Sequence, residues 1–196
     1  MPKKMETRVV EIKNLTTRNG LENEPVTVSG YAAVFNSRAE ICDWFTEEIE
    51  PGAFAKAISE SDVRALFNHS WDNVLGRMKS GTLKLSEDER GLQFEIELPD
   101  TSVARDLVVS MERGDINQCS FGFYPTIEEW DYSVEPAHRK INEVELYEIS
   151  IVSLPAYDDT EASVVRSKEI SANVEKRMKI INQIKKINQT LEGIGL

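Results

Sequence analysis

Two runs of alternating residues, Thr82-Leu-Lys-Leu85 and Leu92-Gln-Phe-Glu-Ile-Glu-Leu98, decide the character of the fold. Apolar and polar residues alternate in both, which is the period of a strand with one buried face. The intervening Ser86–Gly91 is polar and ends in glycine, as hairpin connections commonly do. The sequence therefore predicts an antiparallel strand pair here.

Working outward from this hairpin, most of the chain has the same strand-rich character. Further strands are predicted at Val26–Val34, Val63–Phe67, Asn117–Tyr124, Ile127–Tyr132 and Val144–Leu154. Only two helices are expected before the C-terminal region: Ala53–Ser59, after the break at Pro51, and about Thr101–Arg113, between a capping Asp100 and Gly114. The stretch Val134–Lys140 is predicted to be a polar loop. Short strands at close spacing with few helices predict an α+β fold, with a small antiparallel β-barrel-like core flanked by helices.

Composition sets limits on the class of protein. The chain has 196 residues, 40% of them hydrophobic, and a formal net charge of −11, which suits one globular domain with at most an appendage. No uncharged apolar run has the length of a membrane helix, and the first residues lack the apolar core of a signal peptide. Two cysteines cannot form a disulfide framework. We expect a soluble protein of a reducing compartment, without membrane or nucleic-acid partners, because DNA binding needs a basic surface.

The C-terminal region differs from the rest in charge. From Ser167 onward there are six basic and three acidic residues, whereas the preceding part has 17 basic and 31 acidic. Residues 170–191 are amphipathic, with an approximate heptad of apolar positions that Arg177 and Asn188 interrupt. We therefore predict two units: a domain over 1–167 and an amphipathic C-terminal helix within 168–196. This tail is either a plain solvated helix or a docking segment.

The candidate bases are the two histidines. His69 ends the predicted strand Arg64–His69, whereas His138 falls in the predicted loop. A serine hydrolase needs a base with a pKa near neutrality, and His69 is the better held of the two. Its structural alternative is a strand-end residue bonded to a turn.

The candidate nucleophile lies in Gln118-Cys-Ser-Phe-Gly-Phe-Tyr124. Alternation places Cys119 with two phenylalanines on a core face, and Ser120 with Gly122 on the other face. Because glycine has no side chain, Ser120 would be open to an extended peptide. The alternative is a small residue under an overlying element.

The third candidate is Glu148, in the predicted strand Val144–Leu154. Alternation groups it with Leu146 and Ser150 on one face. A buried carboxylate needs hydrogen bonds or a positive partner, which a histidine would supply. An exposed edge strand is the alternative, and Glu143, Glu145 and Asp72 are weaker candidates for the same role. Ser120, His69 and Glu148 together offer a nucleophile, a base and an orienting acid.

Five ordered blocks carry a resemblance to a known family. Leu66–His69 with Val74–Arg77, Cys119–Phe123 and Glu145–Tyr157 resemble the histidine, nucleophile and closing-strand motifs of the tailed-phage prohead (head maturation) serine proteases, relatives of the herpesvirus assemblins. Tyr31–Phe35 and Ile49–Phe54 are similar to early segments of that family, so the resemblance covers about residues 8–166.

The resemblance implies an assemblin-like fold and a serine endopeptidase that cleaves scaffolding segments of capsid precursors, and often its own ends. It implies Ser120 as nucleophile and His69 as base; Glu148 stands where assemblins use a second histidine. The implied partners are the major capsid protein precursor or scaffold, with a possible homo-oligomer, inside the immature capsid in the host cytoplasm. No cofactor or metal is expected, because the cysteines and histidines show no ligand spacing.

Two alternatives stay open at the level of sequence. A protease could use Cys119 as its nucleophile, although a thiol among phenylalanines is usually inert. A non-enzymatic capsid assembly or scaffolding module could instead use the acidic surface and the tail for docking.

Overall fold

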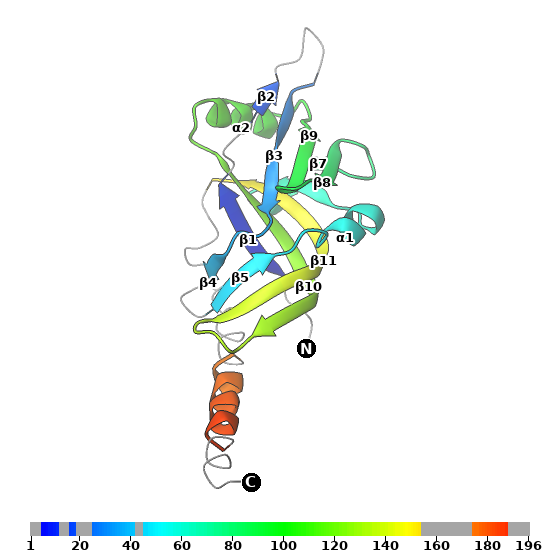
Figure 1. Ribbon diagram of the computed structural model, residues 1–196. Helices are drawn as coiled ribbons and strands as arrows, with labels where there is room; N and C mark the ends of the chain where they lie inside the picture. The colour runs from blue at the N-terminus through cyan, green and yellow to red at the C-terminus, as the bar shows by residue number, and fades with distance from the viewer. Residues whose placement is uncertain (1–4, 12–15, 19–24, 42–44, 154–173, 188–196) are drawn as a thin grey trace.

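The computed structural model describes residues 5–11, 16–18, 25–41, 45–153 and 174–187 (Figure 1). The elements in chain order are β1 (Glu6–Glu11), β2 (Thr16–Arg18), β3 (Thr27–Val34), β4 (Ala39–Ile41), β5 (Phe45–Ile49), α1 (Ala55–Glu60), β6 (Arg64–Phe67), β7 (Ser70–Arg77), β8 (Leu83–Glu87), β9 (Gly91–Glu97), α2 (Ser102–Glu112), β10 (Gln118–Asp131) and β11 (Ala137–Val152). Residues 174–187 form a further helix.

The strands form two sheets. The larger has the order β1-β10-β11-β5-β4, with β6 paired to β11 and β7 paired to β6; the smaller has the order β2-β3-β9-β8. The hairpin predicted from Thr82–Leu98 is confirmed, because β8 and β9 pair in antiparallel register with Leu85 opposite Phe94. The α+β class is also confirmed. Strands predominate, and the described residues between 5 and 153 contain two short helices, α1 and α2.

The predicted barrel-like antiparallel core needs correction. Neither sheet closes on itself in the described part of the chain. The larger sheet is mixed, because β11 runs antiparallel to β10 but parallel to both β5 and β6. Strand pairing of this kind depends on distant partners, and local alternation does not reveal it.

One hydrophobic core contains side chains from both sheets. Alternate residues of β9 and β10, among them Phe94, Phe121 and Phe123, are almost completely buried in it. Helix α1 adds Ala57, and α2 adds Leu107. The core accounts for one face of β10 and leaves the opposite face, that of Ser120, to be explained separately.

The two helices are bounded by local signals. Thr101, rather than the predicted Asp100, is the N-cap of α2, and its hydroxyl accepts a hydrogen bond from the Ala104 N–H at 3.3 Å. Gly114 follows the helix with φ +81°, as a C-terminal stop requires. Helix α1 has no side-chain cap and begins after the buried Phe54.

Two long strands, β10 and β11, replace several of the predicted segments. β10 continues through Pro125, and β11 begins at Ala137, inside the stretch predicted to be a loop. His138 is consequently a buried strand residue rather than a loop residue. The two strands pair along most of their length, with register shifts at three places that bend the pair.

The C-terminal helix, residues 174–187, extends away from the end of the β10–β11 pair (Figure 1). Val174 is buried, and the Arg177 guanidinium donates a hydrogen bond to the Tyr132 hydroxyl at 2.9 Å. Ile180, Ile184 and Ile187 are about half exposed. No helix in the described ranges is both long enough and apolar enough to cross a membrane.

Candidate active site

His69 lies in a tight turn between two strands. Phe67 of β6 pairs with Ser70 of β7, so that Asn68 and His69 are the two central residues of the hairpin. Both have positive φ, 50° and 56°, which is the requirement of a type I′ turn and normally favours Asn-Gly. A histidine in the second position is strained, and such strain is concentrated at functional sites.

Strand β11 holds this turn in place. Because β6 runs parallel to β11 with Phe67 beside Ile151, the turn folds back over the end of β11. The Asn68 N–H donates to the Ile151 carbonyl at 3.0 Å, and the Asn68 Oδ1 accepts from the Ser153 N–H at 2.9 Å. These hydrogen bonds hold the turn, and with it His69, against the end of β11.

Glu148 reaches the same place from β11. Its side chain is buried, and it owes its direction to an irregularity: Gly122 pairs with Glu148 but Phe123 pairs with Leu146, so that Tyr147 is an extra residue. Leu146 and Ile149 are both in the core, which corrects the sequence-based grouping of Leu146 with Glu148. A β-bulge of this kind reorients the neighbouring side chains.

His69 and Glu148 are in direct contact. The His69 Nδ1 lies 2.9 Å from the Glu148 Oε1. Because an ionised carboxylate can only accept hydrogen bonds, the network assigns a proton to Nδ1. In the neutral imidazole, Nε2 is then left as the basic nitrogen.

Ser120 lies beside this pair on β10. It is opposite Ser150 across the β10–β11 ladder and opposite Val9 of β1 on its other side. Directly opposed residues of antiparallel strands have Cβ atoms about 4.5–5.5 Å apart, and the Ser150 hydroxyl is 3.2 Å from the backbone nitrogen of His69. Ser150 is therefore a common neighbour of Ser120 and of the histidine turn.

The Ser120 face of β10 is not open as the alternation suggested. Ser120 itself is completely buried, and β10 has a paired strand on each side. An extended peptide could pair with β10 only by displacing β1 or β11.

Two atoms of this group lack hydrogen-bond partners. Over the described ranges, three buried side-chain polar atoms have no partner: the His69 Nε2, the Ser120 Oγ and the Asn142 Oδ1. Buried polar groups are nearly always paired, and exceptions need an explanation. The first two are the atoms between which a serine hydrolase transfers its proton.

Gly122 makes room for the carboxylate. A Cβ atom at this position would lie 2.5 Å from the Glu148 Oε1 and 2.9 Å from the Met5 Sδ. Glycine is thus required for the close approach of the Glu148 side chain to β10.

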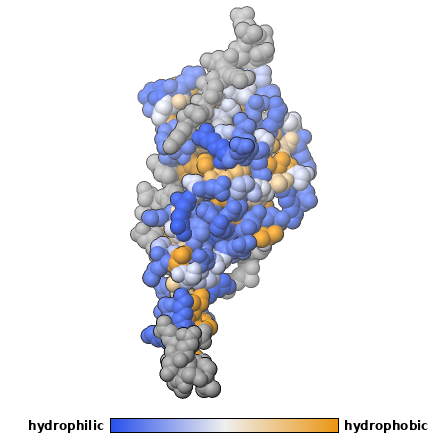
Figure 2. Space-filling view, in the orientation of Figure 1, coloured by the Kyte–Doolittle hydropathy of each residue, from blue (hydrophilic) through white to orange (hydrophobic). Residues whose placement is uncertain are grey.

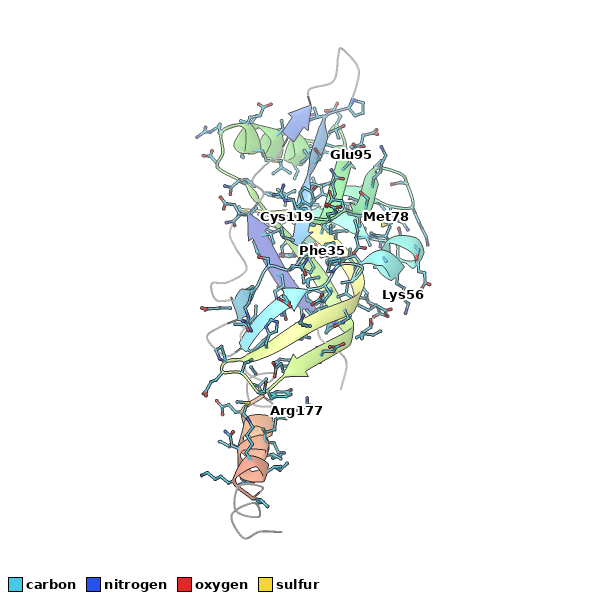
Figure 3. All side chains as sticks on the ribbon, in the orientation of Figure 1. Phe35, Lys56, Met78, Glu95, Cys119 and Arg177 are labelled. Carbon is cyan, nitrogen blue, oxygen red and sulfur yellow. The ribbon has the colours of Figure 1, made fainter. Side chains whose placement is uncertain are left out.

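Cys119 occupies the opposite face of β10, inside the body of the protein (Figure 3). Its side chain is completely buried, and burial, followed by the nearby Glu148 charge, raises the pKa of the thiol far above its ordinary value. A reactive cysteine needs a lowered pKa and some exposure, so this environment favours an inert thiol.

The other candidates lie elsewhere. His138 contacts the Thr46 hydroxyl at 2.8 Å and lies ten residues before Glu148, which is about 30 Å along an extended strand. Glu143 accepts hydrogen bonds from Thr126 and Lys56, and Glu145 accepts one from Tyr147. Asp72 is exposed on β7. In the described part of the chain, no group of three or more His, Cys, Asp or Glu side chains could hold a metal ion.

The sequence pattern places Ser150 on the face of Glu148 but indicates no role for it, and it does not predict the strained turn. Asn68, a residue that tolerates positive φ, followed by a short polar stretch, was the available signal for the turn.

Comparisons with known proteins place the chain in a family. The model of the caudovirus prohead serine protease family matches residues 13–176. Among solved structures, that of the bacteriophage T4 capsid assembly protease, gp21, is similar with a TM-score of 0.49 and 8% sequence identity, covering 78% of this chain and 98% of that chain. A comparison with curated proteins finds no match.

The family match covers most of the sequence and therefore shows the class of protein. The chain belongs to the caudovirus prohead serine proteases.

Proposed function

We propose that this protein is a serine endopeptidase that cleaves scaffolding segments of capsid precursors during phage head maturation, and that it also cleaves its own ends. The observation that carries the proposal is the group formed by Ser120, His69 and Glu148. A buried hydroxyl and a buried imidazole nitrogen lie without partners beside a histidine–carboxylate hydrogen bond.

The proposed reaction is acyl transfer on a peptide bond. The His69 Nε2 takes the proton of the Ser120 hydroxyl as the oxygen attacks the scissile carbonyl. The imidazolium then gives this proton to the leaving amine, and a water molecule repeats the sequence to release the acyl group. The Ser120–His69 hydrogen bond is proposed to form when substrate binds, since catalytic hydrogen bonds often tighten only in the complex.

Glu148 is proposed to orient the base. Its Oε1 accepts the Nδ1–H of His69, which keeps Nε2 basic and stabilises the imidazolium that forms during the reaction. The burial of the carboxylate strengthens this electrostatic interaction, because few water molecules screen it.

The substrate is proposed to be the major capsid protein precursor or its scaffold, inside the immature capsid. The helix at 174–187 is proposed to bring the enzyme to this partner. It presents half-exposed isoleucines next to five basic side chains and one acidic one, and Figure 2 shows apolar side chains reaching the surface of this segment. An acidic amphipathic segment of the precursor would match it in charge.

The test is Ser120→Ala, co-expressed with the coat or scaffold precursor and followed by mass spectrometry of both chains. We expect wild-type protein to shorten the precursor and its own termini over time, and Ser120→Ala to leave all masses unchanged. The neighbouring Cys119→Ala is the matched control and should process normally. Undiminished processing by Ser120→Ala would rule the proposal out.

The same experiment separates the alternatives. If Cys119→Ala stops processing while Ser120→Ala does not, the thiol is the nucleophile. If neither precursor nor enzyme is ever shortened and a fluorophosphonate fails to label Ser120, the protein acts as a non-enzymatic assembly module.

A further inference from the structure

Ser150 is a buried polar residue that the proposed reaction does not use. It is completely buried on β11, opposite Ser120 in the sheet. Its hydroxyl is 2.5 Å from the Glu148 Oε2 and 3.2 Å from the backbone nitrogen of His69. It therefore contacts two members of the proposed catalytic group at once.

The direction of these hydrogen bonds follows from the chemistry of the groups. A carboxylate can only accept, so the Ser150 hydroxyl donates to Glu148; a backbone N–H can only donate, so the same oxygen accepts from His69. Glu148 in turn accepts from the His69 Nδ1–H through its other oxygen, at 2.9 Å. The three residues form a closed ring of hydrogen bonds, which includes both the backbone and the side chain of His69.

This ring fixes two features of the general base: the orientation of its imidazole plane and the position of its backbone. One bond fixes the carboxylate, and hence the imidazole plane, while the other fixes the peptide of the turn from which the imidazole extends. That turn has two consecutive residues of positive φ. His69 therefore needs hydrogen bonds from the surrounding structure to keep this conformation.

We propose that Ser150 is a positioning residue for the protease: it holds Glu148 and the His69 turn in the arrangement that aims the His69 Nε2 at Ser120. This inference rests on the proposed function of Ser120, His69 and Glu148. It gives Ser150 no contact with the reacting atoms, and it predicts that the hydroxyl acts through Glu148 and through the backbone of the His69 turn.

The experiment compares Ser150→Ala and Ser150→Thr in the full chain, with Ser59→Ala as the control. Ser59 is exposed on α1, and its hydroxyl donates to the Lys56 carbonyl, outside the Ser120 group. The readouts are kcat and KM on a peptide that spans a mapped cleavage site, the rate of fluorophosphonate labelling of Ser120, and the melting temperature. Ser120→Ala is measured in parallel.

We expect Ser150→Ala to lower kcat and the labelling rate by about 10–100-fold, the range seen when residues that orient catalytic ligands are removed, with KM changed less than about threefold. Ser150→Thr keeps the hydroxyl and should recover most of the rate. Ser59→Ala should match the wild type. A smaller folded fraction would lower the number of labelled molecules and leave the labelling rate constant unchanged, whereas loss of positioning lowers the rate constant itself and should be rescued by threonine.

A double variant tests whether Ser150 works through Glu148. Glu148→Gln with Ser150→Ala should lose clearly less rate than the product of the two single losses, because residues that act as a unit are not additive. This comparison is made per labelled molecule, so it holds even if Ser150→Ala folds in reduced yield.

Three results would overturn the positioning role: a Ser150→Ala enzyme as fast as wild type, a Ser150→Thr enzyme as slow as Ser150→Ala, or fully additive losses in the double variant. Processing that survives Ser120→Ala would instead overturn the proposed function, whatever the Ser150 variants do.

Discussion

Gly122 illustrates how one missing side chain shapes the site. A Cβ atom there would come within 2.5 Å of the Glu148 Oε1. The carboxylate cannot simply swing aside, because both of its oxygens are held, one by His69 and one by Ser150. We therefore predict that Gly122→Ala lowers the processing rate at least tenfold and destabilises the fold by about 1–3 kcal/mol, as overpacking does.

A second glycine separates these two effects. Gly114, unlike Gly122, has a positive φ of +81°, and a Cβ there meets no atom within 4 Å. Gly114→Ala should cost about 1 kcal/mol of stability and leave the cleavage rate per folded molecule unchanged. Equal cleavage rates for the two variants in a peptide assay would contradict the role given to Gly122.

For single residues, the sequence predicted which side chains belong to the site better than it predicted how these side chains come into contact. The alternation around Ser120 places it on the other face from Cys119. A buried Glu148 needs a partner, for which a histidine is suitable, and the structure shows the contact between Glu148 and His69. The bulge at Tyr147 and the positive φ of His69 could not be predicted, because both depend on which strands pair, and that is decided by contacts far apart in the chain.

Among the elements, the hairpin of β6 and β7 carries His69 and is tied at its open end by an ion pair. The Asp62 carboxylate, just before β6, accepts hydrogen bonds from the Arg77 Nε at 2.9 and 3.0 Å. This contact is the main reason that the pKa of Asp62 is lowered to about 2.

The lowered pKa gives a pH-dependent prediction. A carboxyl group whose pKa is lower in the folded state stabilises that state above its unfolded pKa, and the contribution is lost as the pH falls through the folded pKa. Asp62→Asn should therefore be less stable than the wild type at pH 6, and the two proteins should converge between about pH 4 and pH 2. Urea unfolding at a series of pH values measures this, and a difference that stays constant down to pH 2 would contradict it.

Strand β1 is held to the larger sheet by a buried charge cluster. Arg139 of β11 is almost fully buried and donates to Glu6 of β1 and Glu47 of β5, each at 2.9 Å, and also to Glu128 of β10. Arg8 of β1 contacts Glu47 as well. The cluster links four strands, and it keeps β1 beside Ser120 on β10.

Removing the central cation should be costly. Arg139→Ala leaves the buried Glu6 and Glu47 carboxylates to share Arg8 as their cation, and we expect a loss of about 3 kcal/mol in the free energy of unfolding, the lower end of the range for a broken buried ion pair. Arg139→Lys should recover only part of it, because an ammonium group cannot reproduce the planar set of donors. Urea denaturation gives both values, and a cost below about 1 kcal/mol for alanine would be incompatible with this account.

The elements also show where local pattern stops being informative. The hairpin at β8 and β9 and the helix α2 follow from alternation and capping residues within a few positions. The start of β11 does not, since Ala137–Lys140 is polar and follows Pro136. These residues form a strand because β5 pairs with them in parallel and the charge cluster satisfies Arg139.

At the scale of the whole molecule, the body and the C-terminal helix have opposite charge. The chain carries a net charge of −11, yet residues 174–187 hold five basic side chains and one acidic one. Arg177, at the start of this helix, is bonded to Tyr132 near the end of the β10–β11 pair (Figure 3). The Ser120 site lies toward the other end of these strands, where Ser120 pairs with Ser150, so the helix and the site are separate regions.

This separation leads to a prediction about assembly. Removing residues 168–196 should leave kcat on a short peptide within about twofold of the full chain, because the helix contributes nothing to the Ser120 group. Incorporation of the enzyme into immature capsids should fall at least tenfold, since the apolar and basic surface proposed to bind an acidic precursor is gone.

Full-length protein with Lys185 and Lys186 changed to glutamate is the matched comparison: it keeps the helix, and its incorporation should fall together with that of the truncated chain. Electrostatic binding is screened by salt, so capture of the precursor by the wild-type helix should weaken between 50 and 300 mM salt. Unchanged incorporation of the truncated enzyme would show that the helix is only a solvated extension.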